Sequence, residues 1–298
     1  MSWTTRLHFA VVGGLACFAA LSLTLLASGQ EPRRSRAKLR EPVHRIAKAR
    51  IEPKGNTPVD LHPLDPALRL ARETLELIQT KVIDYSCILV KRERIKGRLL
   101  NSEYMFTEIR NRKVHNGQIT TPFSVYMRFV KPDSVKGREV IYVEGRNKNK
   151  LVAHEGVGAL QFVPPVWIQP NGPIAMRGQL YPITDVGIES LVLKLIEKGE
   201  RDRRQGKCDV QFIKGAKING RLCTVLQVTH PVPRPQLDFH IARIFIDDEN
   251  KLPVRYAAYS WPEKEGGKPQ LLEEYTYLNL KLNLNLTDED FNHTKKFR

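Results

Sequence analysis

The stretch from Leu278 to Leu286 reads LNLKLNLNL, so leucine occupies every second position and asparagine or lysine occupies the positions between. Successive side chains of a β-strand point to opposite faces, and this period of two therefore predicts a strand with one apolar and one polar face. Such a strand belongs in an antiparallel sheet that covers a core with one face only. The stretch thus predicts a one-sided antiparallel sheet.

Upstream of this strand, two turn signals predict hairpins. Asn219-Gly220 is a two-residue turn between apolar stretches at Val210–Ile218 and Arg221–Thr229. A second hairpin is expected to turn near residues 247–250, which read DDEN. The C-terminal third of the chain is therefore predicted to be strands joined by short turns.

The middle of the chain predicts further strands and two helices. Asp65 as N-cap and Pro66 after it start an amphipathic helix to about Thr80, and a second helix follows Thr184 or Asp185 and ends at Gly199. Strands are expected at Tyr85–Ile95, Tyr104–Arg110, Phe123–Val130, Glu139–Val143 and Lys150–His154. The proline-rich residues 164–182 predict a long irregular connection. The fold class is therefore α+β: a large, curved, mostly antiparallel sheet, shaped as an incomplete barrel, with two main helices packed against it.

Residues 1–29 have the layout of an export signal. A short basic head precedes 19 apolar residues from Phe9 to Ala27, and Ala27-Ser28-Gly29 is a small-residue exit. About 20 apolar residues also suffice to cross a bilayer, so a signal anchor is the alternative to a cleaved signal peptide. Five basic residues directly after the apolar run, from Arg33 to Arg40, oppose export because positive charge near a span favours the cytoplasmic side.

The net charge of the 298-residue chain is +16, from 48 Lys and Arg against 32 Asp and Glu. Residues 30–63 predict a basic, proline-containing disordered tether, which is suited to an anionic membrane surface. Residues 64–292 are predicted to form a single α+β domain, and residues 293–298 a basic tail. The domain has no alternation of basic and aromatic side chains on one strand face, which argues against nucleic acid as a partner.

Three cysteines lie in the predicted domain: Cys87, Cys208 and Cys223. With the turn at Asn219-Gly220, Cys223 faces Ala216 and Cys208 faces Pro231, an offset too long for a disulfide between the two cysteines. All three are therefore predicted to be buried free thiols.

No sequence motif predicts a cofactor, a resident metal or a catalytic residue. His230, Asp238 and His240 are the one candidate set for a metal-assisted hydrolase, because Asp238 and His240 are expected to share a strand face. The adjacent carboxylates Glu273 and Glu274 are expected on opposite faces of a strand, which excludes a catalytic pair.

Several stretches resemble a domain-of-unknown-function family of exported proteins expanded in planctomycete bacteria, the family numbered fifteen seventy-one. The matching stretches are Asp84–Cys87, Val90–Arg94, Pro122–Tyr126, Lys131–Gly145, Gly220–Cys223, Ala242–Asp248, Leu252–Tyr256 and Leu272–Tyr277. The resemblance extends from Leu64 to Phe291 and implies export, but it brings no reaction. More distantly, the order of elements is similar to the LolA/LolB-like fold of lipoprotein carriers, which implies a half-barrel around an apolar cavity.

Five apolar residues are candidates for the lining of such a cavity. Phe123, Val125, Met127 and Phe129 alternate on one strand face, and Trp167 lies in the apolar, proline-rich connection. We therefore expect a non-enzymatic periplasmic or envelope protein, secreted or anchored, that binds a lipid or a lipidated partner. The alternatives are a structural or protein-interaction module with a filled core, and the hydrolase.

Overall fold

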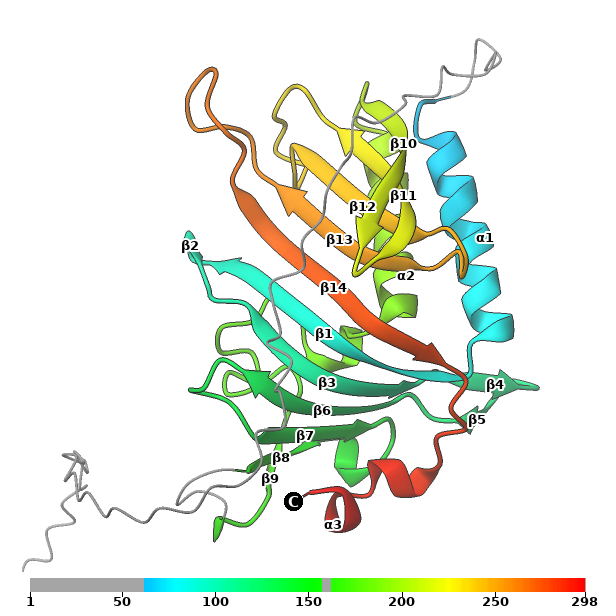
Figure 1. Cartoon of the computed structure of the whole chain (residues 1–298), viewed down its shortest axis with the longest axis vertical. Coiled ribbons are helices and arrows are strands. Elements are labelled where there is room, and N and C mark those ends of the chain that lie inside the picture. The colour runs from blue at the N-terminus through cyan, green and yellow to red at the C-terminus, as the bar shows by residue number, and fades with distance from the viewer. Residues whose placement is uncertain (1–61, 157–161, 298) are drawn as a thin grey trace, which may run out of the picture. The chain divides into compact units, whose positions relative to one another are not determined.

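The computed structural model describes residues 62–156 and 162–297, and these form a sheet with helices on both of its faces (Figure 1). The main helices are α1 (Asp65–Lys81) and α2 (Ile188–Arg203), and the short ones are η1 (Asn147–Asn149), η3 (Ile183–Asp185), η4 (Asp288–Phe291) and α3 (His293–Lys296). The strands are β1 (Asp84–Ile95), β2 (Arg98–Leu99), β3 (Glu103–Arg110), β4 (Lys113–His115), β5 (Gln118–Thr121), β6 (Ser124–Lys131), β7 (Arg138–Val143), β8 (Leu151–Glu155), β9 (Val166–Ile168), β10 (Asp209–Ile218), β11 (Arg221–Thr229), β12 (Ile241–Asp247), β13 (Pro253–Tyr259) and β14 (Leu271–Leu282).

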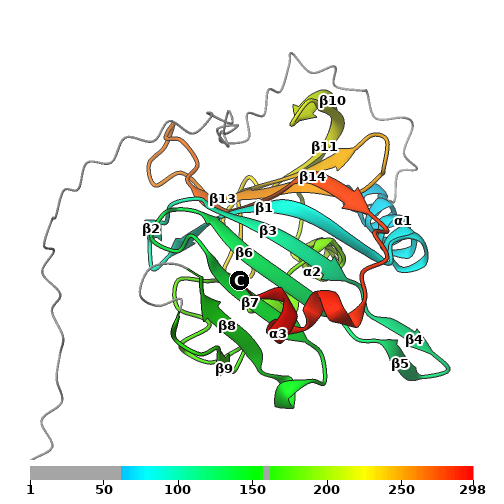
Figure 2. The same ribbon diagram turned by 60° about the horizontal axis from the view of Figure 1, so that its bottom comes forward.

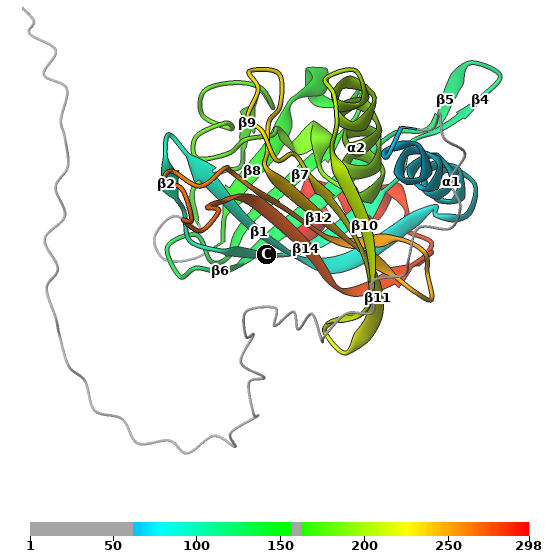
Figure 3. The same cartoon turned by 90° about the horizontal axis from the view of Figure 1, so that it is seen from above.

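The large sheet has twelve strands in the order β10-β11-β12-β13-β14-β1-β3-β6-β7-β8-β9, with β2 added beside β1. Pairing of β14 with β1 joins two antiparallel meanders, one from each half of the chain. The sheet bends around α2, and its edge strands β10 and β9 do not pair with each other within the described residues (Figures 2 and 3). The predicted α+β fold, an open curved antiparallel sheet with two main helices, is confirmed.

Both main helices begin and end slightly away from the predicted residues. Helix α1 has Leu64 rather than Asp65 as its N-cap residue, and Asp65 lies in the first turn, where its Oδ1 accepts a hydrogen bond of 2.7 Å from Arg203 Nε. Helix α2 continues past Gly199 to Arg203, so the predicted end was wrong. A Cβ at Gly199 would lie 2.8 Å from Leu68 Cδ2, and this glycine therefore serves close packing of the two helices, not helix termination.

The helices bury the concave face of the sheet in two clusters. Ile78 of α1 and Ile188 of α2 are 1% exposed and pack on the strands of the N-terminal half of the sheet. Leu64, the N-cap residue, and Leu68 of α1 pack on the strands of the C-terminal half, including Ile244. The concave face is therefore covered by helices, except where the chain between β8 and α2 lies over β6, β7 and β8 (Figure 3).

The leucine alternation that predicted the sheet does not stay on one face. Ile88 pairs with Leu278 but Ser86 pairs with Lys281, so one extra residue enters β14 at Asn279, whose φ is 55°. A residue inserted into a strand reverses the facing of everything that follows. The strand then ends at Leu282, and Asn283 and Asn285 also adopt positive φ, of 54° and 60°. The prediction of one continuous apolar face over Leu278–Leu286 was therefore wrong, because the asparagines mark left-handed backbone.

The C-terminal residues, predicted to begin a basic tail at residue 293, form α3 after η4 and lie on the convex face (Figure 2). Phe291 is 3% exposed and packs with Tyr126, Ile141 and Val143, which alternate away from the concave core. This segment is held at its start by Asp84, whose carboxylate accepts hydrogen bonds from the Leu284 and Leu286 amides at 2.5 and 2.9 Å.

Both predicted hairpins are confirmed, at Asn219-Gly220 and at residues 247–252. The connection predicted to be irregular, residues 164–182, contains the short strand β9, and η3 follows it. No described helix is long and apolar enough to span a bilayer. The export segment at residues 1–29 and residues 30–61 of the predicted tether lie outside the described residues.

Candidate functional site

A cavity of about 520 Å³ lies between the concave face of the sheet and the connection that leads to α2. Figure 3 shows this connection on the same side of the sheet as α2. The volume falls within the range of about 300–1,000 Å³ that is usual for small-molecule sites. This cavity is therefore the candidate functional site.

The floor of the cavity consists of inward-facing residues from consecutive strands. Met105 comes from β3, Met127 and Phe129 from β6, and Leu151 and Ala153 from β8. Because every second residue of a strand faces the same side, each strand contributes a short apolar row. The floor is therefore almost wholly apolar.

The rim of the cavity is formed by the connection and exposes large apolar side chains. Val163, Val166 and Ile174 line the cavity and are 47%, 48% and 72% exposed, and the neighbouring Phe162 is 82% exposed. Exposed apolar groups that gather around a concave site mark a surface that meets a ligand, a partner or a membrane. This rim therefore extends the apolar character of the cavity to the surface.

The concave face becomes polar towards the end of β1. After Leu89, the inward positions are Lys91 and Glu93, which are 9% and 3% exposed. Lys91 Nζ lies 2.9 Å from Gln179 Oε1 and 2.9 Å from Glu103 Oε2, and the Tyr275 hydroxyl donates to Glu93 Oε1 at 2.6 Å. Burial raises the pKa of the Glu93 carboxyl above its ordinary value, although Lys91 and Tyr275 act in the opposite direction. This side of the cavity is thus a closed, compensated polar network.

The other ionic side chains of the lining, in contrast, include more basic groups than acidic groups. Arg138 Nε donates to Glu155 Oε1 at 2.6 Å, and its guanidinium lies 5.8 Å from the centre of the Phe129 ring. Arg177, in the connection, is exposed, and no acidic side chain of the described residues pairs with it. The lining therefore has one basic group in excess near the surface.

The five residues predicted to line a cavity lie in different places. Met127 and Phe129 line the cavity, whereas Val125 is completely buried in the core beside it. Phe123 lies at a second, mostly polar groove of about 620 Å³ near β4 and β5. Trp167 alternates away from the cavity, and its ring meets that of His293 edge-on at 5.8 Å on the convex side.

Among the charged residues of the cavity, Lys91, Arg138 and Arg177 were not predicted from the sequence. Lys91 and Arg138 carried a usable signal, because each occupies an inward position of a strand whose neighbouring inward position, Leu89 or Val140, is apolar. Arg177 had none, since its place depends on how an irregular connection folds over the sheet.

The candidate hydrolase residues do not form a site. Asp238 and His240 precede β12 and are not on a strand, so the shared strand face was wrong. Asp238 pairs with Arg201 at 2.7 Å, whereas His230 Nε2 lies 3.2 Å from Asp202 Oδ2 and His240 Nδ1 lies 2.8 Å from the His230 carbonyl. Within residues 62–156 and 162–297, no three His, Cys, Asp or Glu side chains are grouped so that they could hold a metal.

Cys87, Cys208 and Cys223 are buried and are not joined by a disulfide, as predicted. Cys223 faces Ala216, but a bulge with Gly215 at φ 84° shifts the remaining register, so that Asp209 pairs with Thr229. The expected pairing of Cys208 with Pro231 is therefore wrong by one residue. Burial raises the pKa of the Cys223 thiol to about 11, which keeps it protonated and unreactive.

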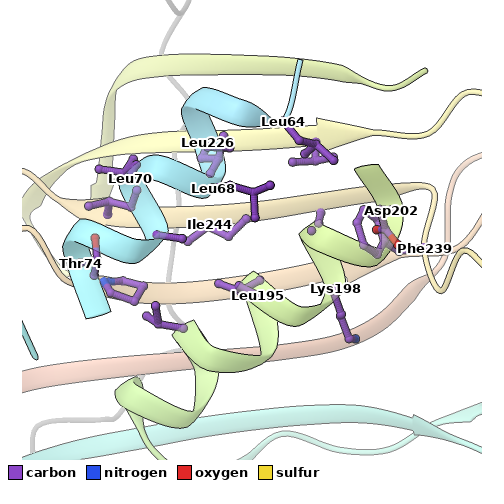
Figure 4. A pocket seen from close by; sticks show the side chains of 18 residues that line it. Leu64, Leu68, Leu70, Thr74, Leu195, Lys198, Asp202, Leu226, Phe239 and Ile244 are labelled. Atoms are coloured by element: carbon purple, nitrogen blue, oxygen red, sulfur yellow. The ribbon is translucent and has the colours of Figure 1, made fainter. Parts of the chain in front are cut away.

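A smaller pocket, of about 70 Å³, lies where α1 and α2 meet the sheet (Figure 4). Leucines of both helices, among them Leu68 and Leu195, point towards Leu226 and Ile244 of the strands. Lys198 and Asp202 are the only charged residues of its lining. The pocket is a packing defect between helices and sheet and is much smaller than the candidate site.

Comparison with solved structures found proteins similar to this chain at low sequence identity. A DUF1329 family protein from Desulfovibrio piger is 13% identical, with 78% of this chain and 99% of that chain covered and a TM-score of 0.37. A LolA superfamily protein from Nitrosomonas europaea is 12% identical, with 76% and 97% covered and a TM-score of 0.30. The Pseudomonas aeruginosa MucA/MucB complex is 16% identical, with 76% and 60% covered and a TM-score of 0.39.

Comparison with curated proteins gave no match. A family model described as "Protein of unknown function (DUF1571)" matches residues 82–297, which include all fourteen strands and exclude α1. This match covers most of the chain and agrees with the resemblance found in the sequence. The chain therefore belongs to the DUF1571 family.

Proposed function

We propose that this protein is a non-enzymatic binding protein of the cell envelope whose cavity takes an apolar ligand, such as the acyl chain of a lipid or of a lipidated partner. The observation that carries the proposal is the cavity of about 520 Å³ with its floor of inward-facing apolar strand residues. An acyl chain gains about 0.8 kcal/mol for each methylene group that leaves water, so an apolar floor alone provides affinity. The exposed apolar rim supports the same assignment, because a chain would pass from it into the cavity.

Export is the second part of the proposal. It is supported by the basic head, the 19 apolar residues and the small-residue exit within residues 1–29. The basic residues that follow would then lie near an anionic bilayer surface, whether the apolar segment is cleaved or stays as an anchor. A periplasm-active reporter fused to the C-terminus tests this part, and a silent reporter would contradict it.

Photochemical labelling of the full chain tests the binding part. Cells that express the chain are fed a fatty acid with a photoactivatable group on the acyl chain, and peptides are analysed by mass spectrometry after irradiation. We expect adducts on residues of the cavity floor, such as Met127 and Leu151. Complete absence of such adducts would contradict the proposal and favour the alternative, a protein-interaction module of the envelope.

Two tryptophan variants make this test specific. Ala153→Trp places a large side chain in the cavity and should abolish labelling of the floor, since Ala153 lines it. Leu222→Trp is the matched control, because Leu222 is 53% exposed on β11, outside the lining of the cavity. Circular dichroism of each variant establishes that it is folded. Labelling that persists in folded Ala153→Trp would show that the lipid binds elsewhere.

A further inference from the structure

The ionic groups of the cavity fall into two sets that differ in how well they are compensated. On the side of β1, Lys91 contacts Glu103 at 2.9 Å and Glu93 at 3.8 Å, so its charge is matched within the protein. A third neutral partner, Gln179, accepts a hydrogen bond from the same ammonium group. This side therefore has no unmatched positive charge for a ligand.

On the side of β7 and the connection, the basic charge exceeds the acidic charge. Arg138 and Arg177 line the cavity there, and Glu155 is the single carboxylate of the lining. Arg138 donates a hydrogen bond from its Nε to Glu155. Within the described residues, this is the one hydrogen bond of the Arg138 side chain. No hydrogen bond among residues 62–156 and 162–297 uses the two terminal nitrogens of Arg138 or the guanidinium of Arg177, so these groups are available as donors.

The position of these donors relative to the apolar floor restricts the ligand. The Arg138 guanidinium lies over the Phe129 ring, with 5.8 Å between the guanidinium carbon and the ring centre, and Phe129 belongs to the floor. Arg138 is 37% exposed and Arg177 is exposed, so both groups lie at the boundary between the floor and solvent. A charged head beside an apolar chain would meet an arginine at this boundary while its chain is buried.

We infer that the ligand of this cavity is an anionic amphiphile, with an acyl chain on the apolar floor and a carboxylate or phosphate head held by Arg177 and Arg138. This inference rests on the proposed function and names the ligand class for the same cavity. Arginine suits both heads, because its planar group binds the two oxygens of a carboxylate or phosphate together. A neutral acylated head would leave the excess positive charge unmatched.

The test compares two probes of equal chain length on the full chain in cell extracts at neutral pH. One is photoactivatable hexadecanoic acid, and the other is the alcohol with the same chain. We expect the acid to label the cavity at lower concentration than the alcohol. Arg177→Gln should raise the concentration needed for half-maximal labelling by the acid about tenfold, which corresponds to about 1.4 kcal/mol, and leave the alcohol unchanged.

Arg69→Gln is the matched control, because Arg69 is an exposed arginine of α1 that lines none of the described cavities. Arg138→Lys keeps the charge but not the planar donor pair, so it should weaken acid labelling less than Arg177→Gln does. Equal labelling by acid and alcohol, with no effect of Arg177→Gln, would overturn the inference while leaving the proposed function intact. Failure of both probes would instead remove the proposed function.

Competition with lysophospholipids distinguishes the two possible heads. Displacement of the acid probe by lysophosphatidate at lower concentration than by hexadecanoate indicates a phosphate head, and the reverse order indicates a carboxylate. Either result supports an anionic ligand. Lysophosphatidylcholine, whose head has no net charge, should be the weakest competitor, and equal displacement by it would contradict the inference.

Discussion

Replacement of Asp84 should destabilise the protein more than any other single change of a carboxylate on the sheet. Asp84 is completely buried, and its two carboxylate oxygens accept the backbone N–H groups of Leu284 and Leu286. Its carbonyl also accepts the Asn283 amide at 2.8 Å. One side chain therefore fixes the point at which the chain leaves β14 and crosses to the convex face.

The magnitude follows from the two hydrogen bonds to the charged group. Each such bond contributes about 1.5–3 kcal/mol, and water can replace part of this at Leu284, whose side chain is 41% exposed. Asp84→Ala should therefore lower the free energy of unfolding by about 3 kcal/mol. Asp84→Asn should lower it by about half as much, because the amide keeps one acceptor but turns an NH₂ group towards the other backbone donor.

Urea unfolding, followed by circular dichroism, measures the loss, and hydrogen exchange locates it. The Leu284 and Leu286 amides should lose protection in Asp84→Ala, whereas amides of β6 keep theirs until global unfolding. Asp133→Ala is the control, because Asp133 is an exposed carboxylate in the turn after β6. If Asp84→Ala stays within about 0.5 kcal/mol of the wild type, the carboxylate does not anchor this segment and the reasoning is wrong.

Four further predictions follow from buried groups. Ile109→Ala should lower the free energy of unfolding by about 2–5 kcal/mol in urea titration, because Ile109 is completely buried; a loss below 1 kcal/mol would mean that the core relaxes around the site. Gly187→Ala should destabilise measurably in the same assay, since φ is 117° and a Cβ would lie 3.0 Å from the Tyr85 hydroxyl; unchanged stability would contradict this strain. The raised pKa of Glu93 means that the folded state holds this proton more tightly than the unfolded state, so the stability contributed by protonation is full at acid pH and is lost as pH rises through the raised pKa. The free energy of unfolding of Glu93→Gln, measured relative to that of the wild type, should therefore increase as pH rises. A decrease of this difference with pH would refute the assignment. Burial raises the pKa of Cys87, so iodoacetamide should modify it only after unfolding, and modification of the native protein would show that the strand opens.

Much of the sheet was predictable from the sequence because its strands follow the period of two and its turns use turn residues. The Asn219-Gly220 hairpin and the shared face of Val125, Met127 and Phe129 are examples. The errors arose where one residue type serves two purposes. Asn279 looks like the polar face of a strand but adopts φ 55°, and Gly199 looks like a helix end but makes room for Leu68.

The candidate site was less predictable, because it is formed by a segment without period. The strand residues of the floor follow alternation, and Met127 and Phe129 were named from it. The roof depends on how the residues between β8 and α2 fold back, and no local pattern places Arg177 or Ile174 over the sheet. Trp167, chosen for its apolar character, lies in β9 between Val166 and Ile168, which line the cavity. Because neighbouring residues of a strand face opposite sides, Trp167 faces the convex side and contacts His293.

The charged inward positions are the strongest physical argument that this region of the concave face is not simply a packed core. A filled core favours apolar residues at every inward position, because a buried charge costs free energy unless it is paired. β1 follows the apolar rule at Cys87 and Leu89 and breaks it at Lys91 and Glu93, and β7 breaks it at Arg138. Lys91 and Arg138 line the cavity from two sides, and Glu93 lies beside Lys91, 3.8 Å from its ammonium group. Sequences that depart from local consistency do so mainly at functional sites, and Lys91 and Arg138 are two such departures at the cavity.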